Sequence, residues 1–375
     1  MRLLHLHSSF NAGGKELRAV RLMNLFGRGV THTVVSAERE AYAAAAAVDS
    51  GIAVSYPDDF PALAGPLRLG RLQALARAMA GHDLVLTYNW GAMDAVMAHT
   101  LFSQMLRLPP LVHHEDGFNE DEAQRLKPMR NWYRRIGLGR AAGLIVPSER
   151  LERIALDTWQ QPRWRVRRIG NGIPTRDYPG RPRADALPRV IKRRGELWLG
   201  TLAGLRAVKN LTRLVRAFAG LPEEWQLVIL GEGPEREAIR AEAMRLEVGH
   251  RVHLPGFVAD PGKVLGLFDL FALSSDSEQF PISVVEAMAT GLAIASPAVG
   301  DVAGMVASEN AQFIVAPGRD DTLAEALRTL AADPALRARI GAANQARARA
   351  DYDEAAMLAA YRETYAGALG RQSFP

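Results

Sequence analysis

Short apolar runs alternate with longer amphipathic stretches along this chain, and the pattern occurs twice, once in each half. In the first half the apolar runs include RLLHLHSS, THTVVSA, HDLVLTYN and AAGLIVPS; in the second they include ELWLGTLAG, WQLVILGEGP, FDLFALSS and LAIASPAV. Strands that alternate with helices of about ten or more residues form a parallel sheet with helices on both faces. The sequence therefore predicts an α/β protein with two doubly wound domains. We expect these domains to face each other across a cleft lined by the loops after the strands.

A change in composition near the middle of the chain predicts the domain boundaries. With 375 residues the chain is too long for one ordinary hydrophobic core. Residues 171–195 are rich in Pro, Gly and Arg and lack periodicity, which indicates a linker. We therefore expect an N-terminal domain at 1–170 and a C-terminal domain at 196–350. Residues 322–366 have a nearly continuous helical pattern, and we expect a C-terminal helix within 351–375.

The composition excludes several classes of protein. The chain has no cysteine, which excludes disulfides and thiol-ligated metals and gives no sign of an oxidising compartment. Hydrophobic residues make up 48% and charged residues 23%, the balance of a soluble globular protein. No apolar run approaches the ~18 to 20 residues of a membrane span. The start, MRLLHLHSSF, is typical of a first strand and not of a cleavable signal peptide, so we expect a cytoplasmic protein.

Basic residues are unevenly distributed in a chain of net charge +5. The stretch Arg125–Arg140 has six cations and no acid, with Trp132 and Tyr133 among them, and RWRVRRIG follows at 163–170. One interpretation is a solvated helix face followed by a basic linker. The other is peripheral contact with anionic lipid headgroups on the inner face of the membrane. Nucleic acid is not an expected partner, because no recognition motif accompanies the charge.

Two carboxylates, Glu278 and Glu286, are separated by seven residues in SSDSEQFPISVVEAMATGLAIASP. Pro281 suits the first turn of a helix and Gly291 suits the position just after its end, so PISVVEAMAT is predicted to be helical. Unpaired N–H groups at such a helix start attract phosphate, and carboxylates accept hydrogen bonds from hydroxyl groups. The arrangement suits a diphosphate with hydroxyls on both sides of it. The alternative is that Glu286 is an ordinary exposed helix residue.

Two cations follow the first strand of the second half. Arg206 and Lys209 lie in a turn between the strand predicted at 197–202 and an amphipathic helix that begins near Asn210. Cations on such a loop would neutralise a leaving group as it develops negative charge. The alternative is that they only decorate the helix start, where positive charge is slightly unfavourable.

The segment SSDSEQFPISVVEAMATGLAIASPAVGDV resembles the signature of glycosyltransferase family four, retaining enzymes of the GT-B fold that use nucleotide sugars. LRAVKN is similar to the phosphate-binding loop of that family, and LVILGEGPERE and RVHLPGFVAD are similar to its next two strands. LIVPSERLERIA, VRRIGNGIPTRDY and, at the front, SSFNAGGKELRAVRLMNLFGRGVTHTVVS also resemble the family, in the same order. The resemblance covers nearly the entire chain. It implies two Rossmann-like domains and a C-terminal segment that crosses back to the first domain.

The resemblance assigns roles to residues of the second half. It implies that Glu286 binds the ribose hydroxyls, that Glu278 contacts the donor sugar, and that Arg206 and Lys209 hold the diphosphate. Main-chain groups would complete the donor site. The resemblance implies that the backbone N–H groups of Ile282, Ser283 and Val284 contact the diphosphate, and that main-chain groups around Gly256 and Phe257 face the base.

In the first half the resemblance implies backbone approach at Gly13 and Gly14, and a histidine of LVHHEDG beside the reacting sugar. His113 aligns best and His114 is the second choice. HHED also contains four potential metal ligands, but consecutive residues on an extended loop point in alternating directions. The only Asp-X-Asp, at 351–353, lies in the C-terminal helical region and not after a strand. We therefore expect no metal and no required cofactor.

The activity implied is transfer of a sugar from a UDP- or GDP-sugar to a lipid-linked or saccharide acceptor, with retention at the anomeric carbon. Cell-envelope glycolipid or polysaccharide biosynthesis is the expected setting. Two positions depart from the family. Ala203-Gly204 stands where Arg often follows a glycine, so the match of cations to phosphates is open, and Gln279 replaces a small residue and would alter donor choice.

Two other functions remain open. Nucleotide-sugar epimerases share the fold, and a catalytically inactive basic protein that binds lipid or nucleic acid would have the same charge. A Rossmann dehydrogenase is disfavoured, because GEGPER lacks the third glycine and NAGGKE lacks the required spacing.

Overall fold

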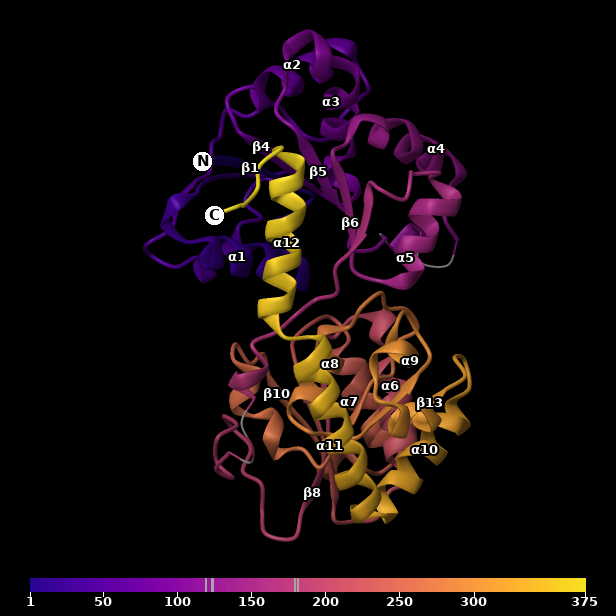
Figure 1. The fold of residues 1–375 in the computed structure, drawn as a ribbon. Helices are drawn as coiled ribbons and strands as arrows, with labels where there is room; N and C mark the ends of the chain where they lie inside the picture. Colours follow the sequence, from indigo (N-terminus) through magenta and orange to yellow (C-terminus); the bar gives the residue numbers. More distant parts are fainter. Residues whose placement is uncertain (119, 123–124, 179, 181) are drawn as a thin grey trace. The chain divides into compact units, whose positions relative to one another are not determined.

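The computed structural model of the chain describes every residue except 119, 123, 124, 179 and 181 (Figure 1). It contains two compact units. Unit 1 comprises Met1–Asn171 and Met357–Pro375, and unit 2 comprises Gly172–Ala356. The residues after 171 that the sequence predicts as a linker are thus part of unit 2, where Tyr178 and Leu187 are buried.

Unit 1 is built on a parallel sheet in which, among the described residues, seven strands have the order β3-β2-β1-β4-β5-β6-β7. The chain turns from one half of the sheet to the other between β1 and β4, which is where ligands bind in open α/β sheets. The strands are β1 (Arg2–His7), β2 (Thr31–Ser36), β3 (Ala53–Ser55), β4 (Leu84–Tyr88), β5 (Leu111–His114), β6 (Gly143–Val146) and β7 (Val166–Arg168).

Helices cover both faces of this sheet, because successive strand residues point to opposite faces and both sets are apolar. Val85 of β4 belongs to the core beneath α2, α3 and α4, whereas Leu84 and Leu86 belong to the core beneath α1 and α12 (Figure 1). The helices are α1 (Gly14–Phe26), α2 (Leu69–Met79), α3 (Met93–Leu106), α4 (Pro128–Gly137), α5 (Glu149–Arg153) and α12 (Glu354–Ala368). The C-terminal helix is therefore a structural layer of unit 1.

Unit 2 has a second parallel sheet, with six strands among its described residues in the order β10-β9-β8-β11-β12-β13. Its strands are β8 (Leu197–Leu202), β9 (Trp225–Leu230), β10 (Val252–Gly256), β11 (Leu270–Ala272), β12 (Ile294–Pro297) and β13 (Ile314–Val315). Its helices are α6 (Leu211–Phe218), α7 (Arg236–Arg245), α8 (Ile282–Ala289), α9 (Val302–Met305), α10 (Asp320–Ala332) and α11 (Pro334–Asp351). α6, α7 and α10 share one core, and α8 and α9 share the other.

The helical pattern predicted over 322–366 is interrupted twice in the structure. Asp333 is extended because it precedes Pro334, and its carboxylate accepts from the Leu336 N–H at 2.9 Å, which caps α11. The second break follows α11, where Asp353 forms a parallel bridge with Ile173. No helix among the described residues has both the length and the apolar character needed to cross a membrane.

Candidate functional site

Glu286 lies in α8, which begins beyond the carboxyl end of β11. Pro281 is the N-cap of this helix, and Gly291 follows it with φ of +82°, so both helix ends fall where the sequence predicts them. Glu286 is only 9% exposed, and its Oε1 accepts a hydrogen bond from the Tyr178 hydroxyl at 2.9 Å. Burial raises the pKa of Glu286 to about 7, and the hydrogen bond from Tyr178 opposes this rise. The alternative of an ordinary exposed glutamate is therefore wrong.

The first turn of α8 presents backbone donors at the same end of the sheet. The Val284 N–H already donates to the Pro281 carbonyl at 3.1 Å. The N–H groups of Ile282 and Ser283 have no hydrogen-bond acceptor among the residues that the structure describes. Two of the three predicted donors are thus available to an anion, which the positive end of the helix dipole favours.

Lys209 and Glu278 come together although they follow different strands. Lys209 ends the turn after β8, and its Nζ lies 2.5 Å from Oε1 of Glu278 in the loop after β11. Ser275 donates to the same carboxylate oxygen at 2.7 Å, and Ser274 donates to the Lys209 carbonyl at 2.9 Å. Both ends of the ion pair are mostly buried, so the pair is held in one geometry by its two loops.

Two glycines allow the loop after β9 to pack closely against the loop after β8. Gly231 and Gly233 have φ of +144° and +155°. A Cβ atom on Gly231 would lie 1.9 Å from the Ala203 carbonyl oxygen, and one on Gly233 would lie 2.4 Å from that of Leu205. This packing leaves Arg206 exposed at the end of β8, with no carboxylate partner among the described residues. The predicted cation is therefore available for a ligand.

Gly256 and Phe257 complete this edge of the unit 2 sheet. The Gly256 carbonyl accepts from the Gly231 N–H at 2.9 Å, which joins the end of β10 to the loop after β9. Gly256 has φ of +107°, where only glycine is unstrained. Phe257 is 67% exposed, which leaves its ring accessible to a ligand.

In unit 1, Gly13 and Gly14 lie at the start of α1. Gly13 is the N-cap, and a Cβ atom there would lie 2.7 Å from the Glu16 carboxylate. Glu16 is itself buried, which raises its pKa, and it pairs with Lys15 at 2.9 Å. The glycines do permit close backbone approach, but the protein's own carboxylate already lies at this helix start.

The two adjacent histidines point to opposite faces of the unit 1 sheet, and both are buried. His113 Nδ1 lies 2.8 Å from the Thr87 hydroxyl, and its Nε2 lies 3.8 Å from Glu115. His114 Nε2 lies 2.9 Å from the Tyr365 hydroxyl, beneath α12. Neither ring reaches the surface of unit 1, and contact of His113 with a sugar stays a prediction. Among the described residues, no group of three or more His, Asp or Glu side chains could hold a metal ion.

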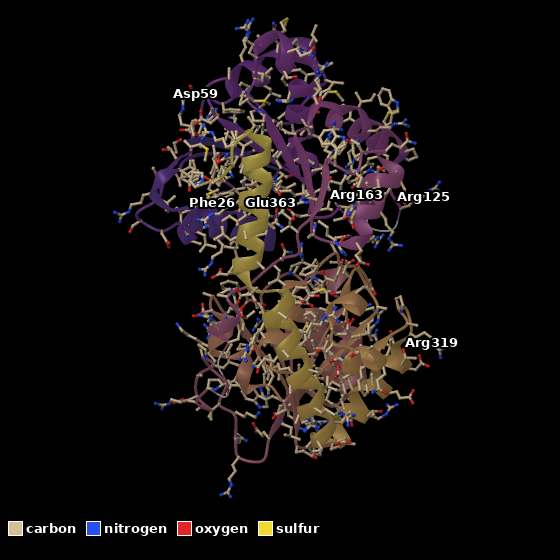
Figure 2. All side chains as sticks on the ribbon, viewed as in Figure 1. Phe26, Asp59, Arg125, Arg163, Arg319 and Glu363 are labelled. Carbon is tan, nitrogen blue, oxygen red and sulfur yellow. The ribbon has the colours of Figure 1, made fainter. Side chains whose placement is uncertain are left out.

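The acids that neutralise part of the basic stretch lie before it in the chain. Arg134 is fully buried, and its guanidinium donates to Glu115 and Glu122, each at 3.1 Å. The interval from residue 125 to 140 does not predict this network, because both acids lie before it in the chain. Arg125, labelled in Figure 2, and Arg135 are exposed without a carboxylate partner in the described part of the chain.

Tyr178 and Ser275 were also missed. Tyr178 lies in the interval predicted as a linker, where nothing in the local pattern indicates a buried hydroxyl. Ser275 is three positions before Glu278 in the quoted signature, a spacing from which a contact could have been inferred.

Comparison with known proteins identifies the fold and the family. The model of Glycosyltransferase Family 4 matches residues 12–177, and the model of Glycosyl transferases group 1 matches residues 188–347. The crystal structure of Anabaena HepE in complex with UDP is similar to the chain, with a TM-score of 0.79, 21% identity, and coverage of 98% of this chain and 100% of that one. The chain belongs to the GT-B glycosyltransferases. The predicted fold class of two Rossmann-like domains is confirmed.

Relatives of this glycosyltransferase include a putative glycosyltransferase and a glycosyltransferase of lipopolysaccharide core biosynthesis. The putative glycosyltransferase EpsF of Bacillus subtilis is 27% identical over 317 residues, covering 78% of this chain and 77% of that protein. The lipopolysaccharide core biosynthesis glycosyltransferase LpsD of Rhizobium meliloti is 31% identical over 179 residues, covering 47% of each.

Proposed function

We propose that this glycosyltransferase moves a sugar from a UDP- or GDP-sugar to an acceptor hydroxyl with retention of the anomeric configuration. The observation that carries the proposal is the buried Glu286 in α8 together with the Lys209–Glu278 pair at the same end of the unit 2 sheet. HepE, which has the same fold, was crystallised with UDP and with UDP-glucose. These complexes support a nucleotide-sugar donor.

In this proposal each group of unit 2 has one task. Glu286 accepts hydrogen bonds from the ribose hydroxyls, and the N–H groups of Ile282 and Ser283 contact the diphosphate at the α8 start. Arg206 and Lys209 stabilise the charge that develops on the leaving phosphate, and Glu278 contacts the sugar. No metal or other cofactor is required, because cations and a helix start already balance the diphosphate charge.

The reaction exchanges one bond to the anomeric carbon for another. The bond from that carbon to the diphosphate oxygen breaks, and its electron pair leaves with the nucleoside diphosphate. The acceptor oxygen forms its bond on the same face, and its proton passes to the departing phosphate oxygen. No protein nucleophile is needed, so electrostatic stabilisation of the leaving group supplies most of the acceleration.

A donor screen tests this function. UDP, GDP and ADP, with their common sugars, are tested for protection against thermal unfolding, and the best donor is then incubated with a lipid extract and with oligosaccharides. We expect one nucleotide to raise the melting temperature and a glycosylated product of retained configuration to form. Conversion of the donor without any acceptor would instead identify an epimerase, and an absence of protection by every nucleotide would overturn the proposal.

We further propose that the acceptor is presented at an anionic membrane surface, which the outer side of α2, α3 and α4 contacts. Seven of the thirteen exposed large hydrophobic residues in the described part of the chain lie on or beside these helices: Leu67, Leu69, Leu101, Met105, Met129, Trp132 and Ile136. Met129, Trp132 and Ile136 share one face of α4 by their spacing. Exposed Arg125 and Arg135 flank them, which suits an interfacial helix.

Vesicle binding tests this contact. We expect sedimentation with vesicles that contain phosphatidylglycerol and little with pure phosphatidylcholine, and we expect Trp132→Ser with Met129→Ser to reduce it. Met244→Ser is the matched control, because Met244 is 71% exposed, close to the 75% of Met129, and lies in α7 of unit 2, outside this layer. Equal binding to both vesicle types, or an equal loss in the control, would refute the contact.

A further inference from the structure

We propose that Tyr178 is a positioning residue for donor binding, whose hydroxyl holds the Glu286 carboxylate in the orientation and charge state that accept hydrogen bonds from the ribose. This inference rests on the proposed function and adds to it a residue outside the regions that resemble the donor site. Tyr178 lies between η7 (Thr175–Asp177) and the first strand of unit 2.

The contact is short, buried and made by one donor. The Tyr178 hydroxyl is 2.9 Å from Glu286 Oε1, and the two residues are 6% and 9% exposed. No other side chain among the described residues donates to this carboxylate. A buried carboxylate with one protein donor depends strongly on that donor, because it has lost the water that would otherwise stabilise its charge.

The segment that carries Tyr178 is anchored on its other side. Ile173 pairs with Asp353 as a parallel bridge, its N–H donates to the Tyr352 carbonyl at 3.0 Å, and the Thr175 hydroxyl donates to Asp353 at 2.5 Å. These bonds fix the backbone before Tyr178, so its hydroxyl is preorganised toward α8.

The charges around the pair keep the proton on the tyrosine. Burial raises the pKa of Tyr178, and the carboxylates of Glu286, Asp260 and Asp177 raise it further. α11, which packs on α8, contributes the uncharged Gln345, whose Nε2 donates to the Ala289 carbonyl at 2.9 Å. Tyr178 thus remains a hydrogen-bond donor near neutral pH. Of the two residues of this pair, Glu286 is the one that titrates there.

Removal of the hydroxyl should therefore favour the protonated form of Glu286. A protonated carboxyl accepts ribose hydrogen bonds poorly, so the nucleotide affinity of the wild type should rise as pH increases through about 7. In Tyr178→Phe the midpoint should move upward by about one pH unit, which is about tenfold weaker binding below the midpoint. The difference in nucleotide affinity between the variant and the wild type should shrink at high pH, where Glu286 is ionised in both proteins.

Calorimetric binding of UDP and GDP between about pH 5.5 and 9 measures this effect. Tyr352→Phe is the matched control, because it removes a hydroxyl that contacts Arg347 and the Met305 carbonyl and not Glu286. The Tyr352 carbonyl that accepts from the Ile173 N–H is unchanged in this variant. Titration of the phosphate is common to all variants and cancels between them. Thermal unfolding of each variant checks that it is folded.

The outcomes separate the two proposals. The inference is supported if the midpoint of the pH dependence of nucleotide binding moves upward in Tyr178→Phe and not in Tyr352→Phe, and if binding by Glu286→Gln does not depend on pH in this range. An unshifted midpoint in Tyr178→Phe, or a loss that is equal at every pH, overturns the inference and leaves the donor site intact if Glu286→Gln still weakens binding. Failure of the wild type to bind either nucleotide, or full binding by Glu286→Gln, overturns the donor site and the inference together.

Discussion

Lys209 and Glu278 form an ion pair, with Nζ 2.5 Å from Oε1, although 69 positions separate them in the chain. The pair joins the loop after β8 to the loop after β11. It keeps the ammonium at the carboxyl end of the sheet and compensates its charge while no anion is bound. A diphosphate that reaches Lys209 would share this ammonium with Glu278. The predicted role of Lys209 at the diphosphate therefore depends on Glu278, which is predicted to contact the sugar.

Lys209→Ala should lower kcat by about 10² to 10³, because the leaving phosphate loses a charge that stabilises it in the transition state. KM for the donor should change much less. Steady-state kinetics with the identified donor measures both. Arg328→Ala removes an exposed cation of α10 and should leave kcat unchanged. A kcat in Lys209→Ala equal to that of the wild type would remove Lys209 from the site.

Glu286→Ala should raise KM for the donor by about 10- to 100-fold, since hydrogen bonds to a charged group contribute about 1.5 to 3 kcal/mol. The effect on kcat should be small, because the ribose is remote from the reacting carbon. Kinetics at saturating acceptor separates the two parameters. Glu325→Ala, at an exposed position of α10, serves as the control. An unchanged KM would contradict the assignment.

Glu286→Gln should stabilise unit 2 at neutral and alkaline pH. The pKa of Glu286 is about 7 in the folded protein against 4.5 for an ordinary glutamate. The stability contributed by the protonated carboxyl is present below pH 4.5 and is lost as pH rises through about 7. The variant should gain about 3 kcal/mol of unfolding free energy at pH 8 relative to pH 4.5, because the pKa shift of Glu286 corresponds to about 1.4 kcal/mol per unit. Urea denaturation at several pH values measures the difference, and a gain independent of pH would refute it.

Acid should destabilise unit 1 through its buried histidines. Burial lowers the pKa of His32 to about 4, and burial and Arg18 lower that of His114 to about 3. The two neutral histidines contribute their full share of the unfolding free energy above about pH 6.5. This share is lost as pH falls from there through the lowered pKa values, at up to about 1.4 kcal/mol per pH unit for each histidine. The protection factors of unit 1 amides, which are exchange rates corrected for the pH dependence of free amides, should therefore fall below pH 6, and should fall less in His32→Gln. His250→Gln, an exposed position, should have no effect.

Arg134→Met should reduce the unfolding free energy of unit 1 by about 3 to 5 kcal/mol, because Glu115 and Glu122 would lose a buried cation. Arg135→Met changes the next residue, which is exposed, and should stay within about 0.5 kcal/mol of the wild type. Chemical denaturation compares them. Equal effects in the two variants would contradict the buried network.

Local pattern was sufficient for the sheet class, for α8 and for most strands, whereas β3 and β7 lie outside the predicted apolar runs. Apolar runs such as WQLVILGEGP predict β9, and Pro281 and Gly291 mark the ends of α8, because strand burial and helix termination depend on residues close in sequence. The order of motifs along the chain likewise indicated the glycosyltransferase family.

Tertiary structure alone decided which side chains meet. The hydroxyl of Tyr178 contacts Glu286 from 108 positions away, and Arg134 is buried against acids that precede its helix. Neither contact follows from periodicity. The burial of Tyr178 and Arg134 depends on segments distant in sequence that meet only when the helices pack against the sheets. The sequence thus determined where α8 and its carboxylate lie, and folding determined what holds that carboxylate and how strongly it binds its proton.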